Sequence, residues 1–162
     1  MAYDLPFSAT ARFGWRAPSE AIRGDQGSMT KRGTLPPVLV VDDNQDNAEI
    51  IRQYLEVRGY PVTVANSGDE ALSLFETVRP AVVLLDVMMP GRDGWEVCRV
   101  IKQHPTLGRT VRVIMVTALD EYQDKREALQ LGADDYVEKP FDLPTLAATV
   151  ERNIAMQRAM AS

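Results

Sequence analysis

The sequence predicts an α/β protein with one parallel sheet that helices cover on both faces. Short apolar runs end on polar residues, and segments with a helical period separate them, so strands and helices alternate. The run at 81–85 is apolar throughout and stops at Asp86, as expected of a strand that is buried on both faces. Right-handed crossovers between successive parallel strands then place helices on the two faces.

Five strand–helix units account for the chain after residue 37. We expect strands at 38–41, 61–65, 81–86, 111–116 and 135–138. Asn44 can cap a first helix that runs to about Arg58 and stops at Gly59. Ser67 can cap a second helix, with Glu70 placed for a capping box. The apolar face that we expect for the first helix comprises Ile50, Ile51, Tyr54 and Leu55.

The remaining helices complete a doubly wound fold. Asp93 begins a third helix, and Asp120 begins a fourth that runs to about Leu131. The fifth begins near Asp142, has Pro144 in its first turn and runs to about Arg158. Five strands most commonly adopt the order 2-1-3-4-5, which is a flavodoxin-like (βα)5 sandwich. In that order strands one and three are neighbours, so the carboxylates that follow them meet.

The length, composition and net charge of the chain limit the classes of function that it can have. The chain has 162 residues, of which 45% are hydrophobic, which suits one domain and a tail. A net charge of -5 argues against a nucleic-acid or anionic-membrane surface. Without a membrane-length apolar stretch or a secretory signal, we expect a soluble cytoplasmic protein and no membrane insertion. Cys98 is the only cysteine, which excludes a disulfide framework, and we expect it in the core.

Residues 1–36 differ from the rest of the chain. They are rich in glycine and proline and have no sustained period, so we expect a mostly disordered tail. One alternative is a docking peptide that uses Tyr3, Phe7, Phe13 and Trp15. Another is that Met29 is the natural start and the upstream residues are a translation artefact. We expect a single folded domain at 37–158 and no output domain after it.

Three carboxylates come together at the predicted sheet edge. Asp42 and Asp43 follow the first strand, and Asp86 ends the third. Such carboxylates repel one another and all remain ionised only beside a cation, so without a metal one of them should have a raised pKa. Hard oxygen ligands open to water suit Mg²⁺, and the absence of histidine and cysteine from the set disfavours zinc.

This cluster can support phosphoryl chemistry. Asp86 can act as a carboxylate nucleophile on phosphorus. Besides Mg²⁺, the hydroxyl of Thr117 and the ammonium of Lys139, which follow the fourth and fifth strands, can hold the phosphoryl oxygens. Pro140 restricts Lys139 to extended geometry, and a cis peptide bond at Pro140 would aim the lysine at the site.

These residues lie in four motifs in a fixed order. They are Val-Val-Asp-Asp-Asn (40–44), Leu-Leu-Asp-Val-Met-Met-Pro-Gly-Arg-Asp-Gly (84–94), Val-Thr-Ala (116–118) and Gly-Ala-Asp-Asp-Tyr-Val-Glu-Lys-Pro-Phe (132–141). Together they resemble the receiver domain of response regulators in bacterial two-component systems, and in particular single-domain, chemotaxis-regulator-like members. The resemblance covers about residues 37–158.

The resemblance implies a role for each site residue. Asp86 resembles the phosphoacceptor, and Asp42 and Asp43 resemble the acidic pair that holds Mg²⁺ with it. The backbone carbonyl of Met88 resembles a further metal ligand. The residues that contact the phosphoryl group or act in the switch would be Thr117, Ala118, Lys139 and Tyr136.

The resemblance also implies the partners. A sensor histidine kinase or a histidine phosphotransfer protein would donate the phosphoryl group. Phosphorylation would draw the Thr117 hydroxyl inward and let the Tyr136 ring turn, which changes the surface of the fourth helix, fifth strand and fifth helix. A downstream protein would read that surface, and its binding would in turn favour phosphorylation. We expect a monomer or a phosphorylation-dependent dimer, with no nucleic acid bound.

Other functions remain as alternatives. The protein could be a phosphorelay intermediate that passes the phosphoryl group onward. A phosphatase or phosphotransferase that uses an aspartyl phosphate would need a second aspartate two residues after the nucleophile, where Met88 stands. A nucleotide- or flavin-binding protein would need a glycine-rich loop after the first strand, where Asp42 and Asp43 stand. We therefore expect no enzyme activity beyond the protein's own phosphorylation and dephosphorylation.

Departures from the family pattern carry further expectations. In the family, polar side chains at the positions of Met88 and Leu119 can orient an attacking water, so we expect slow self-dephosphorylation. Family members with winged-helix output domains usually have an arginine at the position of Thr149. Without that arginine, we do not expect this chain to form the dimer that those members hold together by ion pairs. We also expect His104 at an exposed helix end, and Met88 and Met89 in packing roles.

Overall fold

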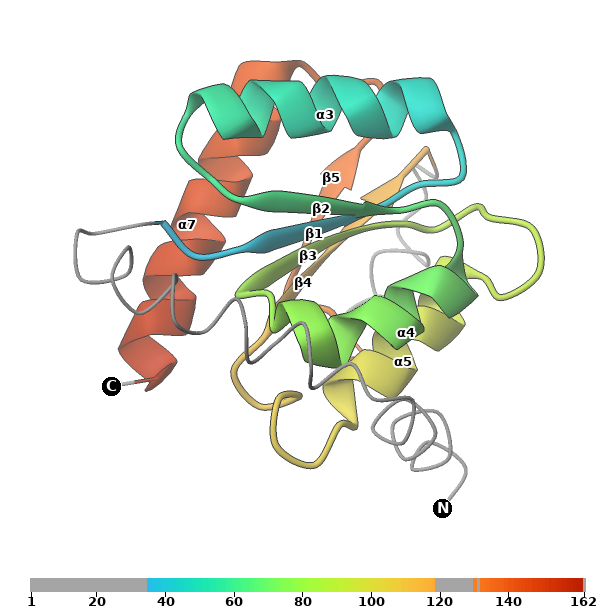
Figure 1. Cartoon of the computed structure of the whole chain (residues 1–162), viewed down its shortest axis with the longest axis vertical. Coiled ribbons are helices and arrows are strands. Elements are labelled where there is room, and N and C mark those ends of the chain that lie inside the picture. The colour runs from blue at the N-terminus through green and yellow to red at the C-terminus, as the bar shows by residue number, and fades with distance from the viewer. Residues whose placement is uncertain (1–34, 119–129, 131, 162) are drawn as a thin grey trace.

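The fold is a five-stranded parallel sheet between two layers of helices (Figure 1). The computed structural model describes residues 35–118, 130 and 132–161. Its strand order, β2-β1-β3-β4-β5, is the predicted one. The elements are β1 (Val38–Val41), α3 (Gln45–Val57), β2 (Val62–Ala65), α4 (Gly68–Val78), β3 (Val82–Asp86), α5 (Gly94–Lys102), β4 (Arg112–Thr117), β5 (Asp135–Glu138) and α7 (Leu143–Ala161).

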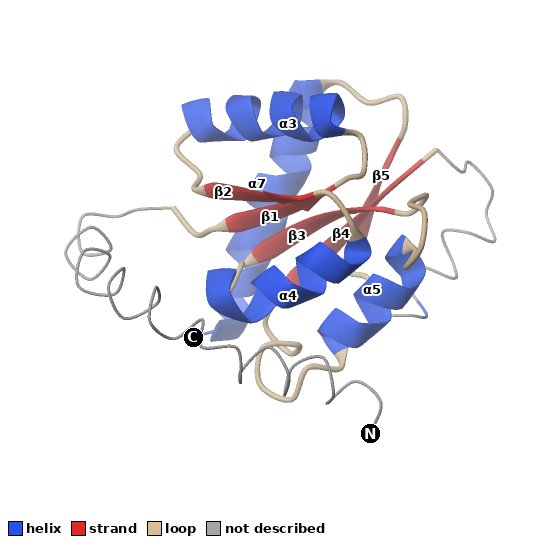
Figure 2. Ribbon diagram, turned by 45° about the vertical axis from the view of Figure 1, so that its right-hand side comes forward, coloured by secondary structure: helices blue, strands red, loops and turns tan. Residues whose placement is uncertain are grey.

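The two faces of the sheet have separate cores. Helices α3 and α7 pack on one face and α4 and α5 on the other, as Figures 1 and 2 show. Alternate residues of β1 enter the two cores: Val38 and Val40 face α3 and α7, whereas Leu39 and Val41 face α4 and α5. Burial of apolar side chains on both faces is the main stabilising term for such a sheet.

The helix starts follow the predicted capping residues. The side chain of Asn44 accepts a hydrogen bond from the backbone of α3, and the Ser67 hydroxyl accepts one from the N–H of Glu70 at 3.1 Å. The Glu70 carboxylate reaches back to the N–H of Asn66 at 2.6 Å, one residue before the cap. The Asp93 carboxylate caps α5 in the same way. These caps satisfy backbone N–H groups that a helix start leaves without partners.

Some expectations about helices are corrected or fall outside the structure. Helix α7 continues to Ala161, beyond the predicted end at Arg158. Ile50 is 52% exposed and does not belong to the buried face of α3, which comprises Ala48, Ile51 and Leu55. The predicted helix at 120–131, apart from residue 130, lies outside the described residues, as do Leu119 and residues 1–34 of the tail. No helix in the described ranges is long and apolar enough to cross a membrane.

His104 is buried, contrary to the prediction of an exposed helix end. Its side chain is 8% exposed, and its Nε2 lies 3.1 Å from a carboxylate oxygen of Glu76 on α4. Its Nδ1 accepts a hydrogen bond from the N–H of Leu107 at 3.0 Å. The ring can be buried because its two nitrogens have partners.

Cys98 is a core residue, as predicted, and burial raises the pKa of its thiol to about 12.

Candidate functional site

The predicted carboxylate cluster is present at the carboxyl ends of β1 and β3. These strands pair with Val41 opposite Leu85, so Asp42 and Asp86 follow side by side. Carboxylate oxygens of Asp42, Asp43 and Asp86 all lie within 4.8 Å of one another. Asp42 and Asp86 are 4% and 5% exposed, whereas Asp43 faces solvent. The cluster is thus buried on one side and open to water on the other.

The electrostatics of the cluster favour a bound cation. Burial raises the pKa of Asp42, the negative charges of Asp86 and Asp43 raise it further, and these effects outweigh a hydrogen bond from the Asn44 N–H and the charge of Lys139. This is the raised pKa that we predicted for one of the three carboxylates without a metal. Oxygen donors beside solvent fit Mg²⁺, which keeps several waters. The residues present therefore suit a hard divalent cation.

Lys139 brings a positive charge to the same place. Its Nζ lies 3.4 Å from Oδ1 of Asp86. Its backbone N–H donates a 2.7 Å hydrogen bond to the Thr117 carbonyl, which fixes the end of β5 beside the end of β4. The peptide bond between Lys139 and Pro140, the candidate for a cis bond, is cis.

The end of β4 brings a hydroxyl residue to this edge of the sheet. Asp86 pairs with Val116, so Thr117 comes one residue beyond the partner of the aspartate. Thr117 is buried, and it pairs in register with Glu138 of β5. Ala118, the next residue, is exposed. The two predicted β4 residues therefore lie at the carboxyl edge with Asp86 and Lys139.

The loop after β3 holds the Asp86 side chain. The N–H of Met88 donates to Oδ1 of Asp86 at 3.3 Å. Met88 is 64% exposed, so the packing role predicted for Met88 is wrong. Met89 is buried, as predicted.

Gly94 was missed by reasoning from sequence alone. It begins α5, and a Cβ built on it would lie 2.3 Å from the Asp86 backbone carbonyl oxygen and 2.8 Å from the Cα of Val87. Only glycine permits this approach of helix to strand. Its N–H donates to the Val87 carbonyl at 3.0 Å, which ties α5 to the strand end. The sequence signal was a glycine that directly follows the capping residue Asp93.

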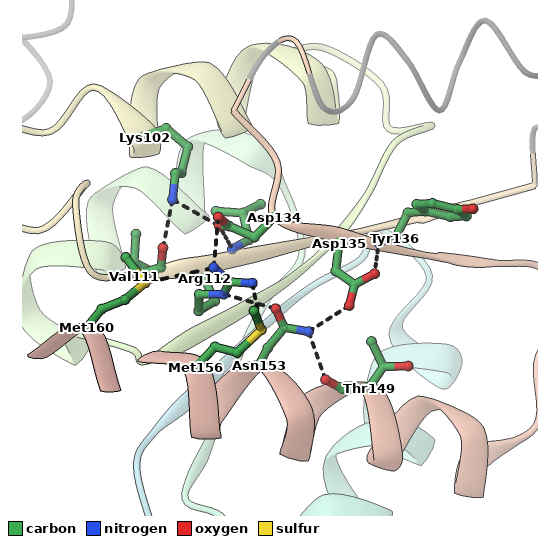
Figure 3. Close-up of polar contacts among 11 residues, drawn as sticks. Lys102, Val111, Arg112, Asp134, Asp135, Tyr136, Thr149, Asn153, Met156 and Met160 are labelled. Carbon is green, nitrogen blue, oxygen red and sulfur yellow. Dashed lines mark hydrogen bonds and ion pairs between the residues drawn. The ribbon is translucent and has the colours of Figure 1, made fainter. Parts of the chain in front are cut away.

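The fifth strand presents Tyr136 and Asp135 to opposite faces. Tyr136 is half-buried and packs against the core on the α4 and α5 face. Figure 3 shows Asp135 directed toward Asn153 on α7 and Tyr136 directed away from that helix. Asn153 donates a 2.9 Å hydrogen bond to Oδ2 of Asp135. Thr149 is buried on α7, and its hydroxyl donates to the Thr145 carbonyl within the helix.

Comparisons with known proteins agree with this geometry. The family model of the response regulator receiver domain matches residues 38–151 of this chain. A receiver domain of Francisella response regulator 1452 is 36% identical, with a TM-score of 0.69, and the match covers 75% of this chain and 98% of that one. Chemotaxis protein CheY4 of Vibrio cholerae is 31% identical, with a TM-score of 0.68 and coverage of 73% and 98%. A receiver domain of a histidine kinase from Syntrophus aciditrophicus is 36% identical, with a TM-score of 0.68 and coverage of 74% and 90%.

Proposed function

Because the chain belongs to the response regulator receiver family, we propose that it accepts a phosphoryl group on Asp86. The donor is a sensor histidine kinase or a histidine phosphotransfer protein. One observation carries the proposal: three carboxylates lie within 4.8 Å of one another, and the Lys139 ammonium lies 3.4 Å from Asp86. A nucleophilic carboxylate, a site for a divalent cation and a fixed positive charge are the parts that phosphoryl transfer to an aspartate needs.

Each residue of the site has a proposed role. Asp42, Asp43 and Asp86 would hold Mg²⁺, with the backbone carbonyl of Met88 as a further ligand. Mg²⁺ held there would supply positive charge for the phosphoryl oxygens. An oxygen of Asp86 forms the new bond to phosphorus while the phosphorus–nitrogen bond of the donor's phosphohistidine breaks and its electron pair stays with the histidine ring. Lys139 stabilises a phosphoryl oxygen by its charge.

The β4 end and Tyr136 would report the phosphorylation state. The Thr117 hydroxyl and the backbone at Ala118 contact the phosphoryl group, and Tyr136 changes its position in response. The proposed partner-binding surface then comprises β5, α7 and the fourth helix that the sequence predicts at 120–131. The support for this role is that Thr117 and Lys139 share a backbone hydrogen bond between β4 and β5. A local charge change at Asp86 can thus act on the strand that carries Tyr136.

We do not propose an aspartyl-phosphate phosphatase. A general acid would be expected two residues after Asp86, and the exposed, apolar Met88 side chain occupies that position. The protein would catalyse only its own phosphorylation and dephosphorylation.

Incubation of the full chain with acetyl phosphate and Mg²⁺, followed by intact mass measurement, tests the proposal. We expect one phosphoryl adduct on the wild type and none on Asp86→Asn. Asp46→Asn is the matched control, since Asp46 is an exposed aspartate in the first turn of α3 and should not alter the adduct. A full adduct on Asp86→Asn would refute the assignment.

A further inference from the structure

Two methionine side chains on α7 converge on a single arginine at the amino end of β4 (Figure 3). Nη2 of Arg112 lies 3.3 Å from Sδ of Met156, and Nη1 lies 3.8 Å from Sδ of Met160. The two methionines are four residues apart, so they lie on the same face of the helix. Arg112 begins β4 and Thr117 ends it, so this cluster lies at the end of the strand opposite the candidate phosphoryl site.

The Arg112 guanidinium has strong acceptors beside two of its nitrogens and a weak one beside the third. Its side chain is only 12% exposed. Nε donates to Asn153 at 3.0 Å, and Nη1 lies 3.4 Å from a carboxylate oxygen of Asp134. Among the described residues, Nη2 has no hydrogen-bond partner other than the sulfur of Met156. Because a thioether sulfur is a weak acceptor, this largely buried cation has donor capacity left for a stronger one.

The sulfur atoms beside Arg112 belong to side chains that solvent reaches. Met156 is 48% exposed and Met160 is 51% exposed. An accessible thioether can be oxidised to methionine sulfoxide, whose sulfur–oxygen group is polar. A sulfoxide oxygen is a stronger hydrogen-bond acceptor than a thioether sulfur. Since the methionine side chain is unbranched and flexible, its sulfur can move outward and let the new oxygen lie beside the guanidinium.

We propose that Met156 and Met160 form an oxidation site in which Arg112 binds the sulfoxide oxygen. A lone pair of the methionine sulfur attacks one oxygen of hydrogen peroxide, and the oxygen–oxygen bond breaks. Its electron pair leaves with the second oxygen, which takes up the proton of the first and departs as water. The sulfur loses two electrons and the peroxide gains them. Reductases that act on methionine sulfoxide can reverse the modification.

Oxidation at this site should stabilise the fold, which is the opposite of its usual effect. A sulfoxide normally disrupts the apolar contacts of a methionine. Here the new oxygen accepts a hydrogen bond from a cation, and bonds of this kind are stronger than neutral ones. The guanidinium also donates to Asn153, which donates to Asp135 on β5. The modification therefore strengthens the attachment of α7 to β4 and, through Asn153, to β5.

Urea unfolding of the full chain before and after mild treatment with hydrogen peroxide tests the proposal. Peptide mass spectrometry first establishes that positions 156 and 160 are oxidised and that the buried Met89 and Met115 are not. We expect oxidation to raise the urea midpoint by about 0.3–1 M, which is the net gain of one hydrogen bond divided by the urea slope of a small domain. A midpoint that falls or stays the same would overturn the proposal.

Leucine variants assign the shift to the two methionines. The double variant Met156→Leu with Met160→Leu nearly keeps side-chain volume and helix preference, so it should fold and show no rise upon oxidation. Met88→Leu is the matched control, because Met88 is 64% exposed and lies in the loop after β3; it should keep the rise. A rise that persists in the double variant, or one that is lost in Met88→Leu, would refute the assignment.

An arginine variant tests the proposed acceptor contact itself. Arg112→Leu removes the donors, so oxidation of this variant should leave its midpoint unchanged or lower it. A rise as large as that of the wild type would show that Arg112 does not bind the sulfoxide. If Arg112→Leu does not fold, the methionine variants decide the outcome alone.

Discussion

Asn153 connects three elements on the α7 face of the sheet. It is fully buried, accepts a 3.0 Å hydrogen bond from Nε of Arg112 on β4 and donates at 2.9 Å to Asp135 on β5 (Figure 3). It also donates at 2.8 Å to the Thr149 carbonyl. The replacement Asn153→Ala removes these three bonds at once. Because β5 carries Tyr136 and leads directly into Lys139, this network holds the strand that the proposed switch uses.

The expected cost follows from the partners that remain. Arg112 keeps a contact with Asp134 at 3.4 Å, and Asp135 keeps the Tyr136 N–H at 2.9 Å. Hydrogen bonds to charged groups contribute about 1.5–3 kcal/mol each, and neutral ones about 0.5–1.5 kcal/mol. Retained partners and entering water reduce the sum, so we expect Asn153→Ala to lower the free energy of unfolding by about 2–4 kcal/mol.

Urea unfolding of the wild type and the variant measures this difference. Arg152→Ala is the comparison, because Arg152 binds the same Asp135 oxygen but its side chain is 59% exposed. An exposed ion pair contributes about 0–1 kcal/mol. If Arg152→Ala costs as much as Asn153→Ala, burial does not decide the strength of these bonds and the reasoning is wrong.

Three further predictions follow from single residues. Burial alone would raise the pKa of Asp135, but the hydrogen bonds that its carboxylate accepts outweigh burial and lower the pKa. The ionised Asp135 therefore stabilises the folded protein fully above the unfolded-state pKa of about 3.9. This stabilisation is lost as the pH falls through the lower folded-state pKa. Urea unfolding should therefore show a cost of Arg152→Ala at pH 7 that shrinks as the pH is lowered below about 3.9, and a cost that stays constant down to the lowest pH at which the protein folds would contradict this. Met88→Asn should hasten loss of the phosphoryl group by about fivefold, because one hydrogen bond that orients the attacking water is equivalent to a rate change of about that size. The decay of the phosphoryl adduct, followed by intact mass, measures this rate. An unchanged decay rate would show that Met88 is not the cause of slow dephosphorylation. Gly94→Ala should lower the free energy of unfolding by about 1–3 kcal/mol, since its Cβ would meet the Asp86 carbonyl at 2.3 Å, and wild-type stability would disprove that close approach.

The strand ends could be predicted because their signals are local. The apolar runs that stop at Asp42 and Asp86 predict two buried parallel strands, and the parallel order brings those ends together. The pair Lys139 and Pro140 likewise marks the end of β5. A charged residue at the end of a buried strand is costly unless it has partners, so its position in the sequence already indicates a site.

The partners of helix residues could not be predicted in the same way. Whether Asn153 reaches both Arg112 and Asp135 depends on how α7 lies over β4 and β5, which no local pattern specifies. His104 was expected in solvent because its neighbour Pro105 ends the helix, yet Glu76 from α4 provides a partner that allows burial. These contacts arise from packing between distant segments, which overrides local preference.

Asp86 is proposed to receive the phosphoryl group with Mg²⁺ bound beside it. The most direct test is to phosphorylate the full chain with acetyl phosphate, reduce the aspartyl phosphate with borohydride and locate the resulting homoserine by peptide mass spectrometry. We expect homoserine at position 86 in the presence of Mg²⁺ and none after chelation with EDTA. Modification at Asp42 or Asp43, or modification at position 86 that is unaffected by EDTA, would contradict the account.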